Sequence, residues 1–204
     1  GHNHVDEVKA LIKDRYVRRA YKDVDEQLPD VVVVWHMVEL GDAQLREYQA
    51  VQADQNLDSL VKIGELVRRA LFAEDDGKVI SAKLDELPGL LDGLGDEQAV
   101  LATQSKVFAH QVAALLKDRG DSYGLITGDV ADAARELAQT KFQGGQLKYM
   151  VGTSAMERGL NLQSAGFFIN LDLPWNPAAL FQRVGRIRRI GSTHRVVTVI
   201  NMIA

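Results

Sequence analysis

The second part of the chain alternates short apolar runs with amphipathic stretches, and this alternation narrows the folds open to it. After residue 96, apolar segments such as "AVLAT", "YGLIT" and "AGFFINLDL" are separated by stretches such as "KVFAHQVAALLKDRG", whose apolar residues recur every three or four positions. Strands that alternate with helices form units in which parallel strands are covered by helices on both faces. We therefore predict an α/β fold with a parallel sheet for residues 96–204.

The first part of the chain has a different pattern of apolar residues. From Val5 to Leu94 the apolar residues mostly follow a helical period, interrupted by the strand-like "VVVVWHMVEL" at residues 31–40. We interpret residues 1–95 as a mainly helical lead-in to the lobe formed by residues 96–204.

Composition excludes several classes of protein. The 204 residues include no cysteine, which rules out disulfides and cysteine-bound metal, and His36, His110 and His194 show no ligand spacing, so we predict no metal site. The longest apolar run is the five-residue "VVVVW", so we expect no membrane partner and a cytoplasmic protein, or a nuclear one in a eukaryote. Because the chain opens on Gly1 rather than methionine, we expect it to be part of a longer protein.

The stretch "QRVGRIRRIGS" concentrates positive charge in a chain whose net charge is −4. Four arginines fall within residues 183–189, and no carboxylate side chain follows Asp172. Asn176 and Pro177 are typical of a helix start, and Gly191 is suited to end that helix.

A helix over this stretch would have one apolar and one basic face. Uncompensated arginines on such a face suit a partner that carries negative charge, because guanidinium groups match phosphate oxygens in a bidentate way. The alternative is a solvated basic surface with no partner, and spacing alone leaves both open. The apolar stripe consists of Leu180, Val184 and Ile187, and the opposite face of Gln182, Arg186 and Arg189, with Arg183 and Arg188 flanking it.

In open parallel sheets, functional side chains lie in the loops beyond the carboxyl ends of the strands. The four loops of interest here are residues 103–106, 127–129, 153–159 and 172–176. The aromatic residues near the last of these loops have a more ordinary interpretation, as members of the apolar core. These are Trp175, Phe167, Phe168 and Phe181.

Residues 153–192 resemble motifs V and VI of the superfamily 2 helicase-like ATPases, and the succession "NL", "D", "WNP", "Q…R…RIG" is similar to the SWI/SNF-type DNA translocases in particular. "VLATQSKVFAHQVAALL" resembles the motif IV region, and "YVRRAYKDVDEQLPDVVVVWHMVELGDAQLREYQA" resembles the passage that leaves the first lobe. The chain departs from the SWI/SNF pattern at Gly185, commonly acidic there, and at Arg188, commonly histidine. The resemblance implies a RecA-like second lobe.

The resemblance also implies roles for particular residues. Arg186 and Arg189 match the paired arginines that reach the γ-phosphate of ATP, and Gln182 matches the leading glutamine of that motif. The end of motif V implies a nucleotide contact by Gly159, Asn161 and Leu162. Contacts with DNA phosphates are implied at the start of motif V and expected at other strand ends, by Thr153, Ser154, Gln104, Ser105, Lys106, Thr127 and Gly128.

The chain contains no phosphate-loop motif of the form G-x-x-x-x-G-K-[ST]. By resemblance, ATP and Mg²⁺ would be bound mainly by an N-terminal helicase lobe, and this chain by itself would hydrolyse no ATP. We therefore expect a lobe of an ATP-dependent translocase with two partners, that first lobe and the phosphate backbone of double-stranded DNA. The alternative is a non-catalytic module that keeps the fold and binds only nucleic acid or protein.

Overall fold

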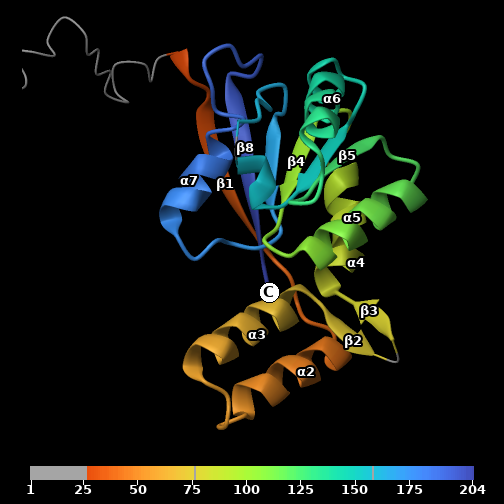
Figure 1. Ribbon diagram of the computed structural model, residues 1–204, viewed down its shortest axis with the longest axis vertical. Coiled ribbons are helices and arrows are strands. Elements are labelled where there is room, and N and C mark those ends of the chain that lie inside the picture. The colour runs from red at the N-terminus through yellow and green to blue at the C-terminus, as the bar shows by residue number, and fades with distance from the viewer. Residues whose placement is uncertain (1–26, 76, 158) are drawn as a thin grey trace, which may run out of the picture.

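A six-stranded parallel sheet organises the protein (Figure 1). The computed structural model describes residues 27–75, 77–157 and 159–204. The strand order is β1-β8-β7-β4-β6-β5, and every neighbouring pair runs parallel. The strands are β1 (Asp30–Met37), β4 (Ala99–Ala102), β5 (Tyr123–Ile126), β6 (Tyr149–Gly152), β7 (Phe167–Asn170) and β8 (Val196–Ile203).

Helices cover both faces of the sheet, which confirms the predicted α/β fold. One face packs against α4 (Ala82–Asp92) and α5 (Lys106–Asp118), with Leu87 and Phe108 wholly buried there. The other face packs against α6 (Asp132–Gln143), the 3-10 helix η3 (Ser154–Glu157) and α7 (Pro177–Val184). Two separate apolar cores result, one on each side of the sheet.

Strand β1 lies within the segment that we interpreted as a lead-in. It pairs with β8 from Asp30↔Val196 to Met37↔Ile203, so the lead-in contributes the edge strand of the main sheet. The predicted boundary between residues 95 and 96 stays a prediction. The helical period before residue 27 lies outside the described residues.

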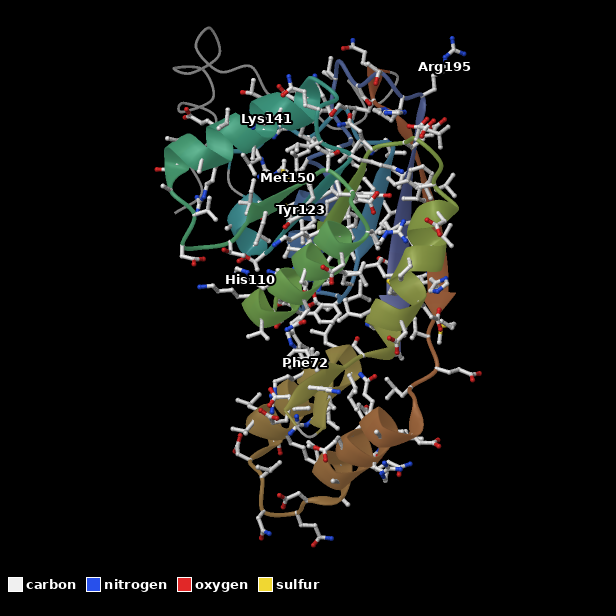
Figure 2. All side chains as sticks on the ribbon, turned by 90° about the vertical axis from the view of Figure 1, so that its right-hand side faces the viewer. Phe72, His110, Tyr123, Lys141, Met150 and Arg195 are labelled. Carbon is white, nitrogen blue, oxygen red and sulfur yellow. The ribbon has the colours of Figure 1, made fainter. Side chains whose placement is uncertain are left out.

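Helix α4 of the lead-in covers the sheet, whereas residues 42–80 form a small, mainly helical unit below it (Figure 1). It consists of α2 (Asp42–Ala53), α3 (Ser59–Leu71) and an antiparallel hairpin of β2 (Ala73–Asp75) with β3 (Lys78–Ile80). Phe72, just after α3, stacks on Phe108 of α5 with ring centroids 6.0 Å apart, and Figure 2 shows Phe72 at the junction of the two parts. The carboxyl ends of the sheet strands point toward this unit (Figure 1).

Helix α7 begins where the sequence predicted but ends earlier. The Asn176 side chain accepts a hydrogen bond from the Ala178 amide at 2.9 Å, and Pro177 occupies the first turn. The helix ends at Val184 rather than near Gly191, and the next residues form turns, with the Ile187 amide donating to the Val184 carbonyl at 3.1 Å. The prediction that Gln182, Arg186 and Arg189 share one face of a long helix is therefore wrong.

The placement of the aromatic residues is a further correction. Phe168 is in the core, but Trp175 and Phe181 are 68% and 78% exposed. Both lie at or near α7, which packs on the sheet through other side chains. Along the part of the chain that the structure describes, no helix is both long and apolar enough to cross a membrane.

Candidate nucleic-acid and nucleotide interface

The loops after β4 and β7 are joined by Asp172. Its carboxylate accepts hydrogen bonds from the Thr103 hydroxyl at 2.6 Å and from the Gln104 amide at 2.8 Å. Thr103 and Asp172 are both buried, so these bonds hold the main chain at Gln104 in one position. The direction of the strands predicted both loops, but no pattern in the sequence marks Asp172 as the residue that connects them.

Arg183 approaches the same carboxylate from α7. Its Nη1 atom lies 3.6 Å from Asp172 Oδ1 and donates to the Asp172 carbonyl at 3.2 Å and to Asn170 Oδ1 at 3.4 Å. We predicted that Arg183 would flank a solvent-exposed face, but it is only 2% exposed. The correction has a physical reason: α7 packs this side chain against the sheet, where Asp172 compensates its charge.

Lys83 of α4 is a second buried cation near Asp172. Its ammonium donates to the carbonyls of Leu171 and Met202 at 2.7 and 2.8 Å, which ties together the ends of β7 and β8. Burial lowers the pKa of Lys83 to about 8, and the negative charge of Asp172 partly offsets this effect. The sequence carries no signal for this role, because a lysine in the first turn of an amphipathic helix is usually exposed.

The loop after β5 meets the start of α5. The Thr127 hydroxyl donates to Asp129 Oδ1 at 2.5 Å, and Lys106 Nζ lies 2.9 Å from Asp129 Oδ2. These two contacts hold the pKa of Asp129 well below its usual range, the Thr127 hydroxyl having the larger effect. Two predicted phosphate contacts, Lys106 and Thr127, therefore lie together, and Gly128 between Thr127 and Asp129 is exposed.

The neighbouring hydroxyls have different surroundings. Ser105 Oγ accepts the Phe108 amide at 3.2 Å and caps α5. Ser154, the first residue of η3, is exposed, while the Thr153 amide donates to the Ile126 carbonyl at 3.1 Å. Gly152 at the end of β6 is required, since a β-carbon there would overlap the Ile126 carbonyl oxygen.

The residues implied in nucleotide contact form a segment tied to its surroundings by hydrogen bonds. Gly159 is exposed with φ +73°, a conformation that favours glycine. The Asn161 amide donates to Gln139 Oε1 of α6 at 3.0 Å, and the Leu162 amide donates to the Arg186 carbonyl at 3.2 Å. Leu162 is wholly buried in the core and presents no accessible surface to a ligand, so its nucleotide contact stays a prediction.

The two paired arginines border different hollows. Arg186 lines a small internal cavity together with Thr153 and Arg183. Arg189 donates from Nε to the Gly185 carbonyl at 3.2 Å and lines a different hollow, an open groove between α7 and β1. Gln182 is exposed on α7, and Arg188 donates to the Pro29 carbonyl at 2.8 Å, before β1.

The open groove lies between α7 and the edge strand β1, and no pattern in the sequence predicted it. Its volume is about 1230 Å³ and most of its lining is apolar. Trp35 on β1 is 59% exposed there. The groove lies at the edge of the sheet, since β1 has no neighbour on its outer side among the described strands.

The parallel sheet with helices on both faces defines the class of protein: a RecA-like α/β lobe. Residues 82–191 match the family described as "Helicase conserved C-terminal domain", and the chain belongs to this family. It is thus a C-terminal lobe of the superfamily 2 helicase type, whereas its assignment to the SWI/SNF subtype stays a prediction.

Several curated relatives are RNA helicases by name. The ATP-dependent RNA helicase RhlB of Xanthomonas oryzae pv. oryzae is 32% identical over 124 residues, which is 61% of this chain and 21% of that protein. The DEAD-box ATP-dependent RNA helicase CshA of Bacillus subtilis is 33% identical over 118 residues, 58% of this chain and 24% of that protein. The chain therefore spans about a fifth to a quarter of the length of these relatives.

Similar solved structures confirm the fold. The C-terminal part of the Fun30 ATPase domain superimposes with a TM-score of 0.76 at 16% identity and covers 86% of each chain. The Sulfolobus solfataricus SWI2/SNF2 ATPase core in complex with dsDNA has a TM-score of 0.68 at 21% identity, over 97% of this chain and 46% of that one. The C-terminal domain of the DEAD-box protein Dbp5 has a TM-score of 0.52 at 24% identity and covers 59% of this chain and 69% of that one.

Proposed function

We propose that this chain is the second lobe of a two-lobe ATP-dependent motor that moves along double-stranded DNA. One observation carries the proposal: the Leu162 amide donates to the Arg186 carbonyl at 3.2 Å. The segment implied in nucleotide contact and the segment that bears the paired arginines are therefore held together. Such a connection suits a lobe that presents both segments to a nucleotide bound by its partner.

Arg186 and Arg189 would act on the transferring phosphoryl group. Phosphoryl transfer is catalysed mainly by positioning and by neutralising developing charge, and an arginine supplied to the γ-phosphate accelerates it by about 10³ to 10⁵. The planar guanidinium fork fits a triphosphate better than an ammonium does.

We propose that the first lobe supplies the sites for ATP and Mg²⁺. Within residues 27–75, 77–157 and 159–204, no group of three histidine, aspartate or glutamate side chains is placed to hold a metal ion. The arginines suit the negative charge of ATP, and magnesium would supply further neutralisation of the phosphates where the first lobe holds it.

The choice of double-stranded DNA rests on the extent of the fold likeness. The SWI2/SNF2 core solved with dsDNA covers 97% of this chain, which includes the unit formed by α2 and α3, whereas the Dbp5 domain covers 59%. A second candidate is an RNA helicase lobe, which the 32–33% identity to RhlB and CshA favours. In both cases the loops after β4, β5 and β6 would contact phosphates and read no base sequence.

The test is ATP turnover by the two-lobe enzyme in which this chain is joined to its first lobe. Turnover is measured without nucleic acid, with a 30-base-pair DNA duplex and with single-stranded RNA of equal length. We expect the duplex to stimulate turnover by the two-lobe enzyme, and we expect no turnover by the chain alone. Stimulation by RNA but not by DNA would establish the second candidate, and absence of turnover in the two-lobe enzyme would refute both. Turnover by the chain alone would contradict the assignment of the ATP site to the first lobe.

A further inference from the structure

The carboxylate of Asp129 lies between two side chains that are candidates for phosphate binding. One oxygen accepts the Thr127 hydroxyl at 2.5 Å, and the other lies 2.9 Å from the Lys106 ammonium. Lys106 belongs to the start of α5 and Thr127 directly follows β5, so the contact connects segments after two different strands, β4 and β5, at one edge of the sheet.

An ammonium and a hydroxyl that converge on two oxygens of one anion also suit a phosphodiester. A phosphate group presents two anionic oxygens in a comparable arrangement, and lysine and threonine are common donors to the nucleic-acid backbone. A second cation reaches this loop from α6: Arg135 donates to the Thr127 carbonyl at 3.3 Å and also pairs with Asp132 at 3.5 Å. The only acid that contacts Lys106 among the described ion pairs is Asp129.

The Lys106–Asp129 pair is open to exchange. The two side chains are 55% and 58% exposed, and exposed ion pairs are weak. The Thr127 hydroxyl is nevertheless fixed, since Thr127 is almost fully buried. A phosphate can therefore replace the carboxylate without rearranging the strands that carry its donors.

We propose that Asp129 is a built-in competitor for the nucleic-acid backbone, and that a phosphate must displace its carboxylate from Lys106 and Thr127 in order to bind. This inference rests on the proposed function, because it assigns the loops after β4 and β5 to nucleic acid. The consequence is that the phosphate contact at Lys106 and Thr127 is weak by itself, so that a bound strand also needs contacts at other loops. Free phosphate would bind poorly for the same reason.

The test uses the 204-residue chain, with binding measured by fluorescence anisotropy of a fluorescein-labelled 30-base-pair DNA duplex and of single-stranded RNA. Asp129→Asn removes the competing charge and keeps the size of the side chain. We expect it to bind about three- to ten-fold more tightly than the original chain. We also expect the plot of log affinity against log salt concentration to be steeper by about 0.7 to 0.9. The reason is that Lys106, no longer paired with Asp129, neutralises one phosphate, and the counterion condensed on the nucleic acid there is released.

Two controls isolate the effect. Asp118→Asn makes the same charge change at the exposed far end of α5, and we expect it to alter affinity much less. In the background of Lys106→Ala, Asp129→Asn should raise the affinity only by the small amount that Asp118→Asn does. Thermal melting of each variant checks that the fold is retained.

The outcomes separate this inference from the proposed function. If the original chain binds and Asp129→Asn binds no more tightly than Asp118→Asn, the competitor role is wrong. Weaker binding by Asp129→Asn would mean that Asp129 positions Lys106 for the phosphate, which also overturns the inference. If neither the original chain nor Asp129→Asn binds DNA or RNA, the assignment of these loops to nucleic acid fails, and the inference fails with it.

Discussion

Replacing Arg183 by methionine removes one partner of a buried ion pair, and we expect a large loss of stability. The side chains of Arg183 and Asp172 are 3% and 4% exposed, with 3.6 Å between Nη1 and Oδ1. Removing one member of a buried pair typically costs about 3–5 kcal/mol, since the remaining charge is left without compensation. Here Asp172 keeps its hydrogen bonds from Thr103 and Gln104 and the charge of Lys83, so we expect a loss near the lower limit, about 3 kcal/mol.

The assay is thermal and urea unfolding of the 204-residue chain. A loss of about 3 kcal/mol corresponds to a decrease in Tm of about 6–12 °C for a chain of this size. Arg195→Met is the matched control, because Arg195 is exposed, and Figure 2 shows it projecting from the surface. We expect this control to change stability by less than about 0.5 kcal/mol.

A double-mutant cycle tests the physical reason for the loss. Asp172→Asn removes the charge that Arg183→Met leaves uncompensated, so the double variant should lose about 1–3 kcal/mol less than the sum of the two single changes. An additive double variant, or a loss below about 1 kcal/mol for Arg183→Met, would refute the view that these residues form a mutually dependent buried pair.

Three further predictions concern other parts of the site. The pKa of Lys83 is lowered from 10.5 to about 8, so between these pH values the folded chain binds fewer protons than the unfolded chain. The unfolding free energy of the original chain, relative to that of Lys83→Met, should therefore rise from pH 8 to 10.5 by on the order of 3 kcal/mol. A difference in unfolding free energy that stays constant with pH in urea unfolding would contradict this. In the two-lobe enzyme, Arg186→Ala and Arg189→Ala should each reduce nucleic-acid-stimulated turnover by about 10³-fold or more, and lysine at either position should not restore it. Near-normal turnover in both alanine variants would show that neither arginine acts on the phosphate. Gly152→Ala should destabilise the chain by about 1–3 kcal/mol in thermal melting, because the new methyl group overlaps the Ile126 carbonyl oxygen; an unchanged Tm would show that β6 can shift to accommodate it.

Local patterns in the sequence determined the elements of this protein and the edge where its loops gather. The alternation of apolar and amphipathic segments after residue 96 is a property of neighbouring residues, and it predicted the parallel sheet covered on both faces. The start of α7 was predictable for the same reason, because Asn176 and Pro177 act within one helical turn. The strand-end loops followed from the direction of parallel strands.

The tertiary structure alone decided which side chains are buried and which of them meet. Helix α7 ends at Val184, so Arg186 and Arg189 do not continue the face of Gln182. Arg183 lies within the helix, but packing of α7 against the sheet buries it instead of exposing it. The charge of Asp172 then makes the buried position of Arg183 tolerable, although the two residues belong to different elements. Lys83 lies 88 and 119 positions from Leu171 and Met202, whose carbonyls it binds. A periodicity within one element carries no information about a partner in another, because such contacts depend on how the sheet and its helices pack.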